Sequence, residues 1–384
     1  MKFKLVFKQL IIKYFGIISV VILATIISIY TFYTVSTFAG IKDYVGDEVW
    51  YPSAAYNILK LVFHVQVPMN FPYPNEANIQ YYVNPEHPPL PKYIMALFIY
   101  ALGYNPLVWR IPSWILGDLT IIIAFLMARK LIGNNVLGNV SGLIASVLIA
   151  LDPNIWVMHG IAMLEIYAGF FSLFTLYLLL SDRIKSSSVG LGLAFLAKES
   201  LLPLLIPYIY YLGEIVKQRT KRVIYGILIP VAIYVAFSIP LIIYFGGIKQ
   251  WLDASFLHML SWDVTNGHIS LSATNQISAP WDWFLDIHPF FLGYGLYANV
   301  NPLLMWAWVV TTPLAFIMKD IKLIIFTMSA WSIWLGFVAV YFLGNHTLFS
   351  FYVTDFATIS DVYVPISLFK FLNWIELRNK GENN

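Results

Sequence analysis

A small set of ionisable side chains stands out because it lies in segments that are otherwise aromatic or apolar. Its members are Asp47, Glu48, Glu86, His87, Lys92, Arg110, Glu165 and Lys198. A carboxylate can act as general base toward a hydroxyl, and an arginine or lysine can stabilise a leaving group that departs as a phosphate anion. If the fold brings these side chains to one face, they suit the transfer of a group from a phosphate to a hydroxyl.

The residue counts exclude several other kinds of chemistry. The chain has no cysteine, which removes disulfides, thiolate metal sites, haem attachment and cysteine nucleophiles. Its histidines do not show the spacing of a zinc pair such as HExxH, so the sequence predicts neither a metal site nor a cofactor, and assistance by a divalent ion stays open. The net charge of +3, with basic residues in short clusters, argues against nucleic acid as a partner.

The elements that must position these residues are membrane-spanning helices. Of the 384 residues 59% are hydrophobic and 11% are charged, and the mean hydropathy is +0.73, whereas a soluble domain carries about 25% charge. Apolar runs of spanning length cover 14–36, 110–128, 137–151, 164–180, 223–245, 301–318, 323–343 and 348–369. A further run, 188–213, is interrupted by Lys198–Glu199 and predicts two short spans. The expected fold is an all-α polytopic membrane protein with about 10–11 transmembrane helices.

The distribution of lysine and arginine predicts the orientation in the membrane. With a cytoplasmic N-terminus, the segments on that side hold most of the 23 basic residues, as such residues tend to stay cytoplasmic. They are Lys2, Lys4, Lys8, Lys13, Arg129, Lys130, Arg183, Lys185, Lys217, Arg219, Lys221, Arg222, Lys319, Lys322, Lys370, Arg378 and Lys380. The inner connections are then short and two outer segments are long. We therefore expect a multi-pass protein of the cell membrane with an extracytoplasmic active site.

This topology divides a single integral membrane domain, 1–384, into consecutive segments. They are a first span (14–36), an outer catalytic loop with interfacial helices (37–109), central spans (110–245), a second outer loop (246–300), C-terminal spans (301–370) and a cytoplasmic tail (371–384). The first span has no small-residue cleavage site after it, so we expect it to be retained. The stretch 91–104 is apolar but short and precedes Asn105–Pro106, which predicts an interfacial or re-entrant helix.

A membrane-held donor fits the predicted depth of the charged residues. They lie in the first outer segment or near the outer ends of spans, level with the membrane–water interface. Each buried CH₂ of a polyprenyl tail holds its phosphate at the membrane by roughly 0.8 kcal/mol. The sequence therefore predicts glycosyl transfer from a polyprenyl-phosphate-linked sugar, with the lipid bilayer and this donor as partners.

Several motifs, taken in order along the chain, resemble the protein O-mannosyltransferase group, glycosyltransferase family 39. They are DEVWYPSAAY (47–56), HPPLPK (87–92), WRIPS (109–113), LDPNIWVMHGIAMLEIY (151–167), GLAFLAKES (192–200), SAPWDWFL (278–285) and NPLLMW (301–306). The resemblance implies the GT-C class of multi-span glycosyltransferases, with the active site in the first outer loop. It also implies a donor such as dolichyl-phosphate mannose, a protein Ser or Thr hydroxyl as acceptor, and inversion at the sugar. The short chain is similar to archaeal or bacterial members.

Carried over by position, the resemblance implies a role for individual residues. Asp47 matches the catalytic aspartate and would be the general base, while Glu48 would orient the site or bind the acceptor. Arg110 and Lys198 match residues associated with the donor phosphate. Glu165 stands where the family more often has aspartate, which keeps the acid and lengthens its reach by one methylene.

Further candidates complete the predicted site. They are Glu86, His87, Lys92, Trp281 and Trp283. The two tryptophans would stack on sugar, and HPPLPK departs from the family at Pro91, where glycine is usual. Three acids in or near spans, Asp118, Asp355 and Asp361, receive no role from the sequence.

Two alternative functions stay open at this point. The same donor could serve a lipid or glycan acceptor, in place of a protein. A polytopic transporter or lipid flippase would also carry charges within the membrane, and the interrupted run 188–213 favours it. The sequence shows no internal repeat, however, and its charged groups lie toward the outer edge and not at the midplane, which favours the enzyme.

Overall fold

The computed structural model describes residues 2–265 and 276–379, so part of the second outer loop, 266–275, lies outside the described residues. The α-helices are α1 (Lys2–Phe38), α2 (Tyr51–Asn57), α3 (Leu90–Leu102), α4 (Pro106–Ile132), α5 (Val136–Leu151), α6 (Pro153–Gly160), α7 (Glu165–Leu180), α8 (Ile184–Ala197), α9 (Leu205–Ile215), α10 (Arg219–Val223), α11 (Ile229–Tyr244), α12 (Ile248–Ala254), α13 (Phe256–Thr265), α14 (Pro302–Ile317), α15 (Ile321–Leu343) and α16 (Thr354–Asn379). The 3₁₀ and π segments are η1 (Gly46–Val49), η2 (Ile58–Val62), η3 (Ile79–Tyr81), η4 (Glu199–Leu204), η5 (Ile224–Leu228), η7 (Asp282–Leu285) and η8 (Ser350–Val353). Strands β1 (Phe290–Gly293) and β2 (Leu296–Ala298) form an antiparallel hairpin. The predicted all-α architecture is confirmed.

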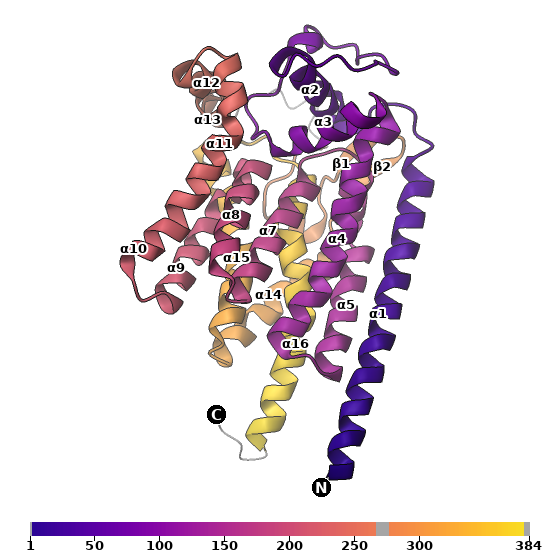
Figure 1. Ribbon diagram of the computed structural model, residues 1–384, viewed down its shortest axis with the longest axis vertical. Coiled ribbons are helices and arrows are strands. Elements are labelled where there is room, and N and C mark those ends of the chain that lie inside the picture. Colours follow the sequence, from indigo (N-terminus) through magenta and orange to yellow (C-terminus); the bar gives the residue numbers. More distant parts are fainter. Residues whose placement is uncertain (1, 266–275, 380–384) are drawn as a thin grey trace.

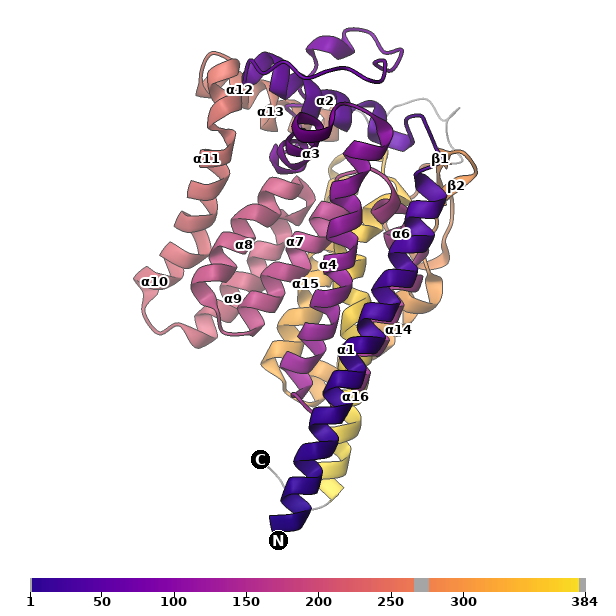
Figure 2. The same cartoon turned by 45° about the vertical axis from the view of Figure 1, so that its right-hand side comes forward.

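The helices form one elongated bundle. α4 packs against α5 and α7, and α16 packs against α5, α7, α14 and α15. Figure 1 shows these helices along the long axis of the molecule, with α1 at one edge. The short helices α2 and α3 gather at one end, and in Figure 2 they cover the ends of α4, α7 and α8. We call this the α2–α3 end, and α1 begins and α16 terminates toward the opposite end.

Four helical stretches are long and apolar enough to cross a membrane by themselves. They are Tyr14–Phe38, Pro106–Ile132, Arg219–Tyr244 and Ile321–Leu343, and the bent pair of α5 and α6 makes up to five among the described residues. Four shorter apolar helices, α3, α7, α8 and α14, have 13 to 16 residues, and the predicted run 348–369 lies in η8 and the 26-residue helix α16. The chain is therefore a polytopic membrane protein, while the expected number of about 10–11 spans stays a prediction.

Two of the predicted interruptions are found in the structure. The stretch 91–104 contains the separate helix α3, which ends at Leu102 and is followed by Gly103 with φ of 88°. The run 188–213 breaks where expected, since Lys198 has extended backbone (φ −162°, ψ 140°) and η4 separates α8 from α9. Because of this break, the Lys198 side chain leaves the helical repeat at the α2–α3 end. It can therefore contact residues of other helices.

A third interruption comes from the Asp152–Pro153 pair. The Asp152 side chain caps α6 by accepting from the backbone N–H of Ile155 at 2.9 Å, and Pro153 occupies the first helical position. The axes of α5 and α6 consequently differ by 66°. α6 then leads into the turn before α7, and this turn contributes a backbone N–H of the site described below.

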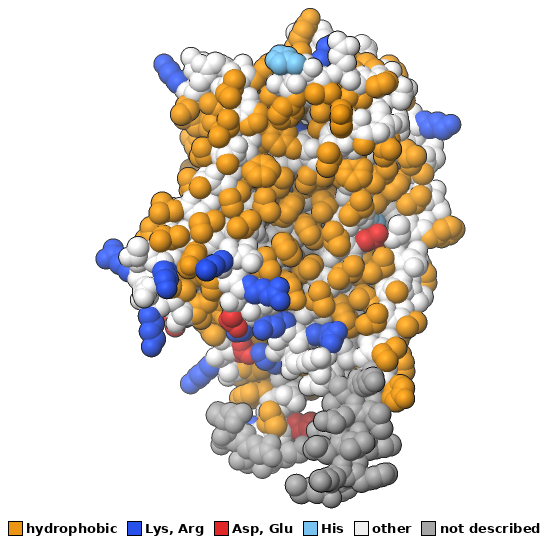
Figure 3. All heavy atoms as spheres, viewed as in Figure 1, with side chains coloured by type: hydrophobic (Ala, Val, Ile, Leu, Met, Phe, Trp, Pro, Cys, Tyr) orange, Lys and Arg blue, Asp and Glu red, His pale blue; other side chains and the backbone are white. Residues whose placement is uncertain are grey.

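Hydrophobic and basic side chains occupy different regions of the surface along the long axis. On the face in Figure 3, hydrophobic side chains cover a broad middle band, and most Lys and Arg side chains gather below it, away from the α2–α3 end. This agrees with the sidedness predicted from the basic residues. Which end faces the cytoplasm stays a prediction.

Candidate active site

The acidic pair Asp47–Glu48 lies on η1 and is anchored through Glu48. The Glu48 carboxylate accepts from Arg110 Nε at 2.7 Å and Nη2 at 2.6 Å, and from the backbone N–H groups of Val45 (3.0 Å) and Ala162 (2.9 Å). Both side chains of the Glu48–Arg110 pair are fully buried. A bidentate pair of this kind is short, directional and strong, so it fixes η1 against α4 and the turn before α7.

The remaining donors of Arg110 bind the chain that leaves α1. Nη1 donates to the carbonyl oxygens of Phe38 (2.9 Å) and Ile41 (2.7 Å), and Nη2 donates to that of Asp43 (2.7 Å). With the two bonds to Glu48, all five N–H groups of the guanidinium have protein acceptors. The geometry therefore gives Arg110 a positioning contact with the first outer segment, and its predicted contact with phosphate stays untested.

Asp47 has a more open environment than its neighbour. Asp47 as a residue is partly exposed, whereas Glu48 is buried, and Tyr51 Oη donates to the Asp47 carboxylate at 3.4 Å. Desolvation by the surrounding protein and the charge of Glu165 raise the pKa of Asp47 to about 6, against the opposing effects of His87 and Lys198. A carboxylate with this pKa is largely ionised at neutral pH and still basic enough to take a proton from a positioned hydroxyl.

Lys198 joins two carboxylates from different helices. Its Nζ lies 2.8 Å from Glu165 Oε1 at the start of α7 and 3.0 Å from Asp355 Oδ2 in the first turn of α16. Its Nζ also lies 4.1 Å from the centre of the Tyr352 ring, and Ser200 Oγ donates to Asp355 Oδ2 at 2.6 Å. All three charged side chains are at most 3% exposed, so the ion pairs are protected from solvent screening.

His87 forms the accessible side of the same cluster. Its Nδ1 lies 3.0 Å from Glu199 Oε1, and the side chains are 18% and 30% exposed. Burial disfavours the charged imidazole, but the neighbouring Glu199 carboxylate outweighs burial and raises the pKa of His87 above its ordinary value. Tyr51 lies edge-on to the His87 ring with 5.9 Å between ring centres, which links His87 to the residue that also contacts Asp47.

Lys92 supports the loop that carries His87. Its Nζ donates to the backbone oxygens of His87 (2.7 Å) and Asn84, and to Asn84 Oδ1 at 2.9 Å. Burial lowers the pKa of Lys92 to about 7. The nearby Glu86 accepts from Tyr82 Oη. Lys92 and Glu86 therefore lie beside the site and stabilise its loop through local contacts.

Together these contacts define what we call the Asp47 cluster. Its members are Asp47, Tyr51, His87, Glu165, Lys198, Glu199, Ser200, Tyr352 and Asp355. Three buried carboxylate oxygens in it, Glu165 Oε2, Glu199 Oε2 and Asp355 Oδ1, have no hydrogen-bond partner among the described residues. A buried acceptor left unpaired costs free energy, so a hydrogen-bond donor that reached these oxygens would remove that cost.

The two tryptophans of the predicted site have contacts elsewhere. Trp283 is fully buried, donates from Nε1 to Ser278 Oγ at 2.8 Å and packs against Phe337. Trp281 is 43% exposed and packs against Tyr341. Trp283 reaches the Asp47 cluster indirectly, because Phe337 also stacks on Tyr352 with 5.3 Å between ring centres. Stacking of either tryptophan on sugar stays a prediction.

Sequence reasoning missed five members of the cluster. Asp355 was among the acids without a role, and Glu199, Ser200, Tyr51 and Tyr352 had not been singled out. Glu199 and Tyr51 stand beside or near Lys198 and Asp47 in the chain, which is a usable signal. Asp355 and Tyr352 come more than 150 residues after Lys198, and only the packing of α16 against α7 brings them to it.

The described residues offer no ready metal site. Within 2–265 and 276–379, no group of three or more His, Asp or Glu side chains has a geometry that could hold a metal ion. The cluster acids are instead engaged by Lys198, His87, Ser200 and Tyr51.

Solved structures share the arrangement of helices. ArnT from Cupriavidus metallidurans, crystallised with undecaprenyl phosphate, superposes with a TM-score of 0.59 at 16% identity, covering 91% of this chain and 60% of ArnT. The oligosaccharyltransferase of Archaeoglobus fulgidus in its apo form superposes with a TM-score of 0.51 at 14% identity, covering 94% of this chain and 52% of that protein. The chain therefore has the GT-C fold of membrane glycosyltransferases, as the sequence predicted.

Sequence comparisons match parts of the chain. Residues 86–244 match the family model described as dolichyl-phosphate-mannose-protein mannosyltransferase. The chain is also 35% identical over 97 residues to the polyprenol-phosphate-mannose–protein mannosyltransferase of Corynebacterium glutamicum, a match that covers 25% of this chain and 18% of that relative. The family match includes His87, Arg110, Glu165 and Lys198, whereas Asp47 and Asp355 lie outside it.

Proposed function

We propose that this chain is a membrane glycosyltransferase that moves a sugar from a polyprenyl-phosphate donor to a hydroxyl, with the Asp47 cluster as its active site. The observation that carries this proposal is the carboxylate of Asp47, a partly exposed residue, within the electrostatic reach of two cationic side chains, His87 and Lys198, at one end of an apolar bundle. Support for a lipid-phosphate donor comes from the GT-C fold and from the undecaprenyl phosphate bound to ArnT.

The proposed reaction begins with removal of a proton from the acceptor. Asp47 takes the proton of the acceptor hydroxyl, and the oxygen attacks the anomeric carbon of the sugar. The new carbon–oxygen bond forms as the bond to the phosphate oxygen breaks, and its electron pair leaves with the polyprenyl phosphate. Attack from the face opposite the phosphate inverts the anomeric centre. The raised pKa of Asp47 suits this proton transfer at neutral pH.

Different cations have different parts in stabilising the leaving phosphate. His87 is the more accessible cation, and its raised pKa favours the imidazolium form. We assign it to direct contact with the departing phosphate, while the buried Lys198 supplies positive charge from behind the site. Arg110 acts through Glu48 by holding η1, and therefore Asp47, in position.

The sugar would be recognised by the unpaired carboxylate oxygens. Glu165, Glu199 and Asp355 each present one buried oxygen that lacks a partner among the described residues. Sugar hydroxyls are hydrogen-bond donors, and three of them directed to these oxygens would fix the ring while satisfying buried acceptors. We propose mannose as the sugar and a protein Ser or Thr as the acceptor, supported by the family match over residues 86–244.

The proposed topology places this reaction on the extracytoplasmic side. The Lys and Arg side chains concentrate away from the α2–α3 end on the face in Figure 3. A cytoplasmic N-terminus follows from the tendency of basic residues to stay inside.

A transfer assay with purified protein tests the proposal. The protein is incubated with radiolabelled polyprenyl-phosphate mannose and a Ser/Thr-containing peptide, with Asp47→Asn as the matched inactive control. We expect label in the peptide with the wild type only. Label in added lipid or glycan acceptors but not in peptide would replace the proposed acceptor. Uptake of the donor into vesicles without covalent transfer would overturn the enzyme and indicate a transporter.

A further inference from the structure

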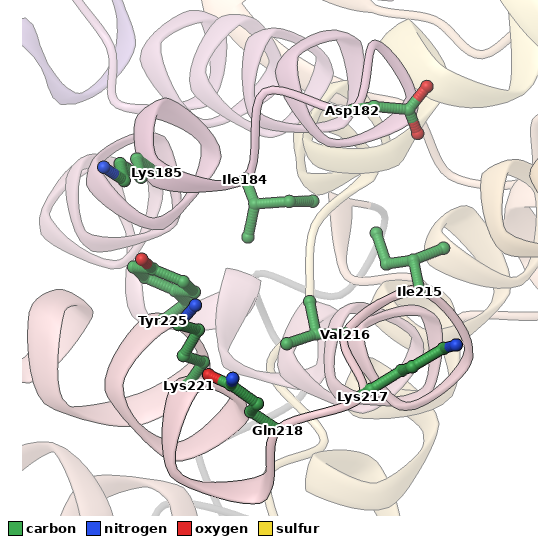
Figure 4. A pocket seen from close by; sticks show the side chains of 9 residues that line it. All are labelled: Asp182, Ile184, Lys185, Ile215, Val216, Lys217, Gln218, Lys221 and Tyr225. Atoms are coloured by element: carbon green, nitrogen blue, oxygen red, sulfur yellow. The ribbon is translucent and has the colours of Figure 1, made fainter.

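A second polar feature lies far from the Asp47 cluster. It is an open groove of about 480 Å³ between the α7–α8 turn and the segment that joins α9 to α10. Its lining residues are Asp182, Ile184, Lys185, Ile215, Val216, Lys217, Gln218, Lys221 and Tyr225. We call it the Lys185 groove, and Figure 4 shows its side chains around a common opening.

The groove carries positive charge that the protein does not neutralise. Lys185, Lys217 and Lys221 line it, and none of them has an acidic partner among the described residues. The one lining acid, Asp182, is already engaged, because Lys322 Nζ lies 2.8 Å from its Oδ2 and Tyr211 Oη donates to its Oδ1 at 3.2 Å. The free charge of the groove is therefore cationic.

The same groove has an apolar surface. Ile184, Ile215 and Val216 lie around its opening in Figure 4, with the Tyr225 ring beside Lys221. Nearby hydrophobic side chains are exposed, including Val223 at 41% and Ile227 at 44%. A tyrosine at such a boundary is typical of the headgroup level of a membrane. A free inorganic anion would use only the lysines, whereas an amphiphile would use both surfaces.

The position of the groove relative to the active-site cluster follows from one helical hairpin. α7 begins at Glu165 in the Asp47 cluster and ends at Leu180, two residues before Asp182. α8 returns from Ile184 in the groove to Ala197, directly before Lys198. The 16 residues of α7 span roughly 24 Å, a large part of the roughly 30 Å hydrocarbon thickness of a bilayer. The two sites therefore face opposite membrane surfaces.

We infer that the Lys185 groove binds the phosphate headgroup of an anionic phospholipid from the leaflet opposite the Asp47 cluster. The lysines recognise the phosphate, and the acyl chains leave the groove over the apolar side chains of η5 and α11. Clusters of Lys and Arg next to membrane helices attract anionic lipids. Each basic residue near the membrane surface increases the affinity about fivefold. This inference does not depend on the proposed enzymatic activity.

Native mass spectrometry of the purified full chain tests it. The probe is phosphatidylglycerol, compared with phosphatidylcholine at equal concentration. The test variant is K185Q/K221Q, and the control is K319Q/R378Q, which removes the same charge from other exposed sites. We expect one retained phosphatidylglycerol in the wild type and the control, and about 20–30-fold weaker retention in the groove variant. K185R/K221R should retain the lipid.

Several results would overturn the inference. Equal loss in the groove variant and the control would mean that overall charge, and not the groove, binds the lipid. Equal retention of phosphatidylcholine would exclude recognition of negative charge. Competition by glycerol phosphate as effective as the lipid would identify a site for a free phosphate. An unchanged melting temperature and gel-filtration profile show that a loss of lipid is not a loss of fold.

Discussion

Charged side chains are buried and paired at one end of the α7–α8 hairpin, whereas lysines are exposed at the other. At one end, Glu165 and Lys198 are almost fully buried and lie 2.8 Å apart. At the other end, Lys185 and Lys221 are exposed and have no acidic partner among the described residues. Yet the hairpin itself is a continuous, mostly buried apolar unit between them. The difference lies in what surrounds the two ends. Other helices and the first outer segment cover the end with Glu165 and Lys198, and they leave the end with Lys185 exposed.

The contrast shows how burial decides what a charge can do. A buried charge is strongly destabilising unless it has a partner, so the Asp47 cluster requires a fixed set of opposite charges from several helices. Such a fixed set is suited to stabilising charge that develops during a reaction. Exposed lysines are stabilised by water and need no partner, so the Lys185 groove is free to attract ions from outside.

The largest effect is expected from removal of the Asp47 carboxylate at the active-site end of the hairpin. Asp47→Asn keeps the side-chain size and removes the base, so we expect a loss of about 10²–10⁴-fold in sugar transfer. Measurement of initial rates with radiolabelled donor in membranes gives the effect. The variant should insert and migrate on gel filtration as the wild type does. Transfer within a few-fold of the wild type would disprove the assignment of Asp47 as base.

The next largest effect concerns the pair that anchors η1. Arg110→Met leaves Glu48 buried without its partner, and we expect destabilisation of about 3–5 kcal/mol. Thermal unfolding in detergent measures it. The double variant E48M/R110M removes both charges and should recover part of the melting temperature. If the anchor positions Asp47, sugar transfer should stay low in the double variant, and recovery of both properties would contradict that role.

The rate of sugar transfer should depend on pH through both Asp47 and His87. Asp47 must be ionised, so activity should fall as pH decreases through about 6, by roughly tenfold at pH 5. His87 must be protonated, so activity should fall again as pH rises above its raised pKa. A rate profile in kcat/KM measures both limbs. H87K should remove the alkaline limb and keep the acid limb, and an unchanged profile would exclude His87.

The smallest effect is expected at the exposed end. Lys217→Gln removes a cation that has no partner among the described residues, so stability should change by less than about 0.5 kcal/mol. Sugar transfer should also equal that of the wild type, because α7 separates the groove from the Asp47 cluster. Thermal unfolding and the transfer assay check both. A large loss in either would show that the two ends are coupled.

Local patterns were enough to predict much of the framework. Apolar runs predicted the helices, Asn105–Pro106 predicted the break before α4, and Lys198–Glu199 predicted the break between α8 and α9. Each of these depends on a few neighbouring residues. The number of spans could not be tested in the same way, because several apolar helices are shorter than the bilayer thickness requires.

The partners of the charged residues were not predictable from local patterns. Arg110 was expected to bind phosphate, yet the structure directs all its donors to Glu48 and three backbone carbonyls. Lys198 was expected at the site, but its bond to Asp355 depends on the packing of α16 beside α7. A guanidinium near a loop has many acceptors within reach, and only the closed fold selects among them.

Composition and spacing by themselves indicated that the chain lies in a membrane, where its helices are, and which types of chemistry its side chains could perform. The tertiary structure decided which acid meets which cation, because residues from η1, α7, the α8–η4 junction, η4 and α16 converge at the α2–α3 end. The physical reason is the range of the forces. Hydropathy acts residue by residue along the chain, whereas an ion pair requires two groups within a few ångströms, whatever their separation in sequence.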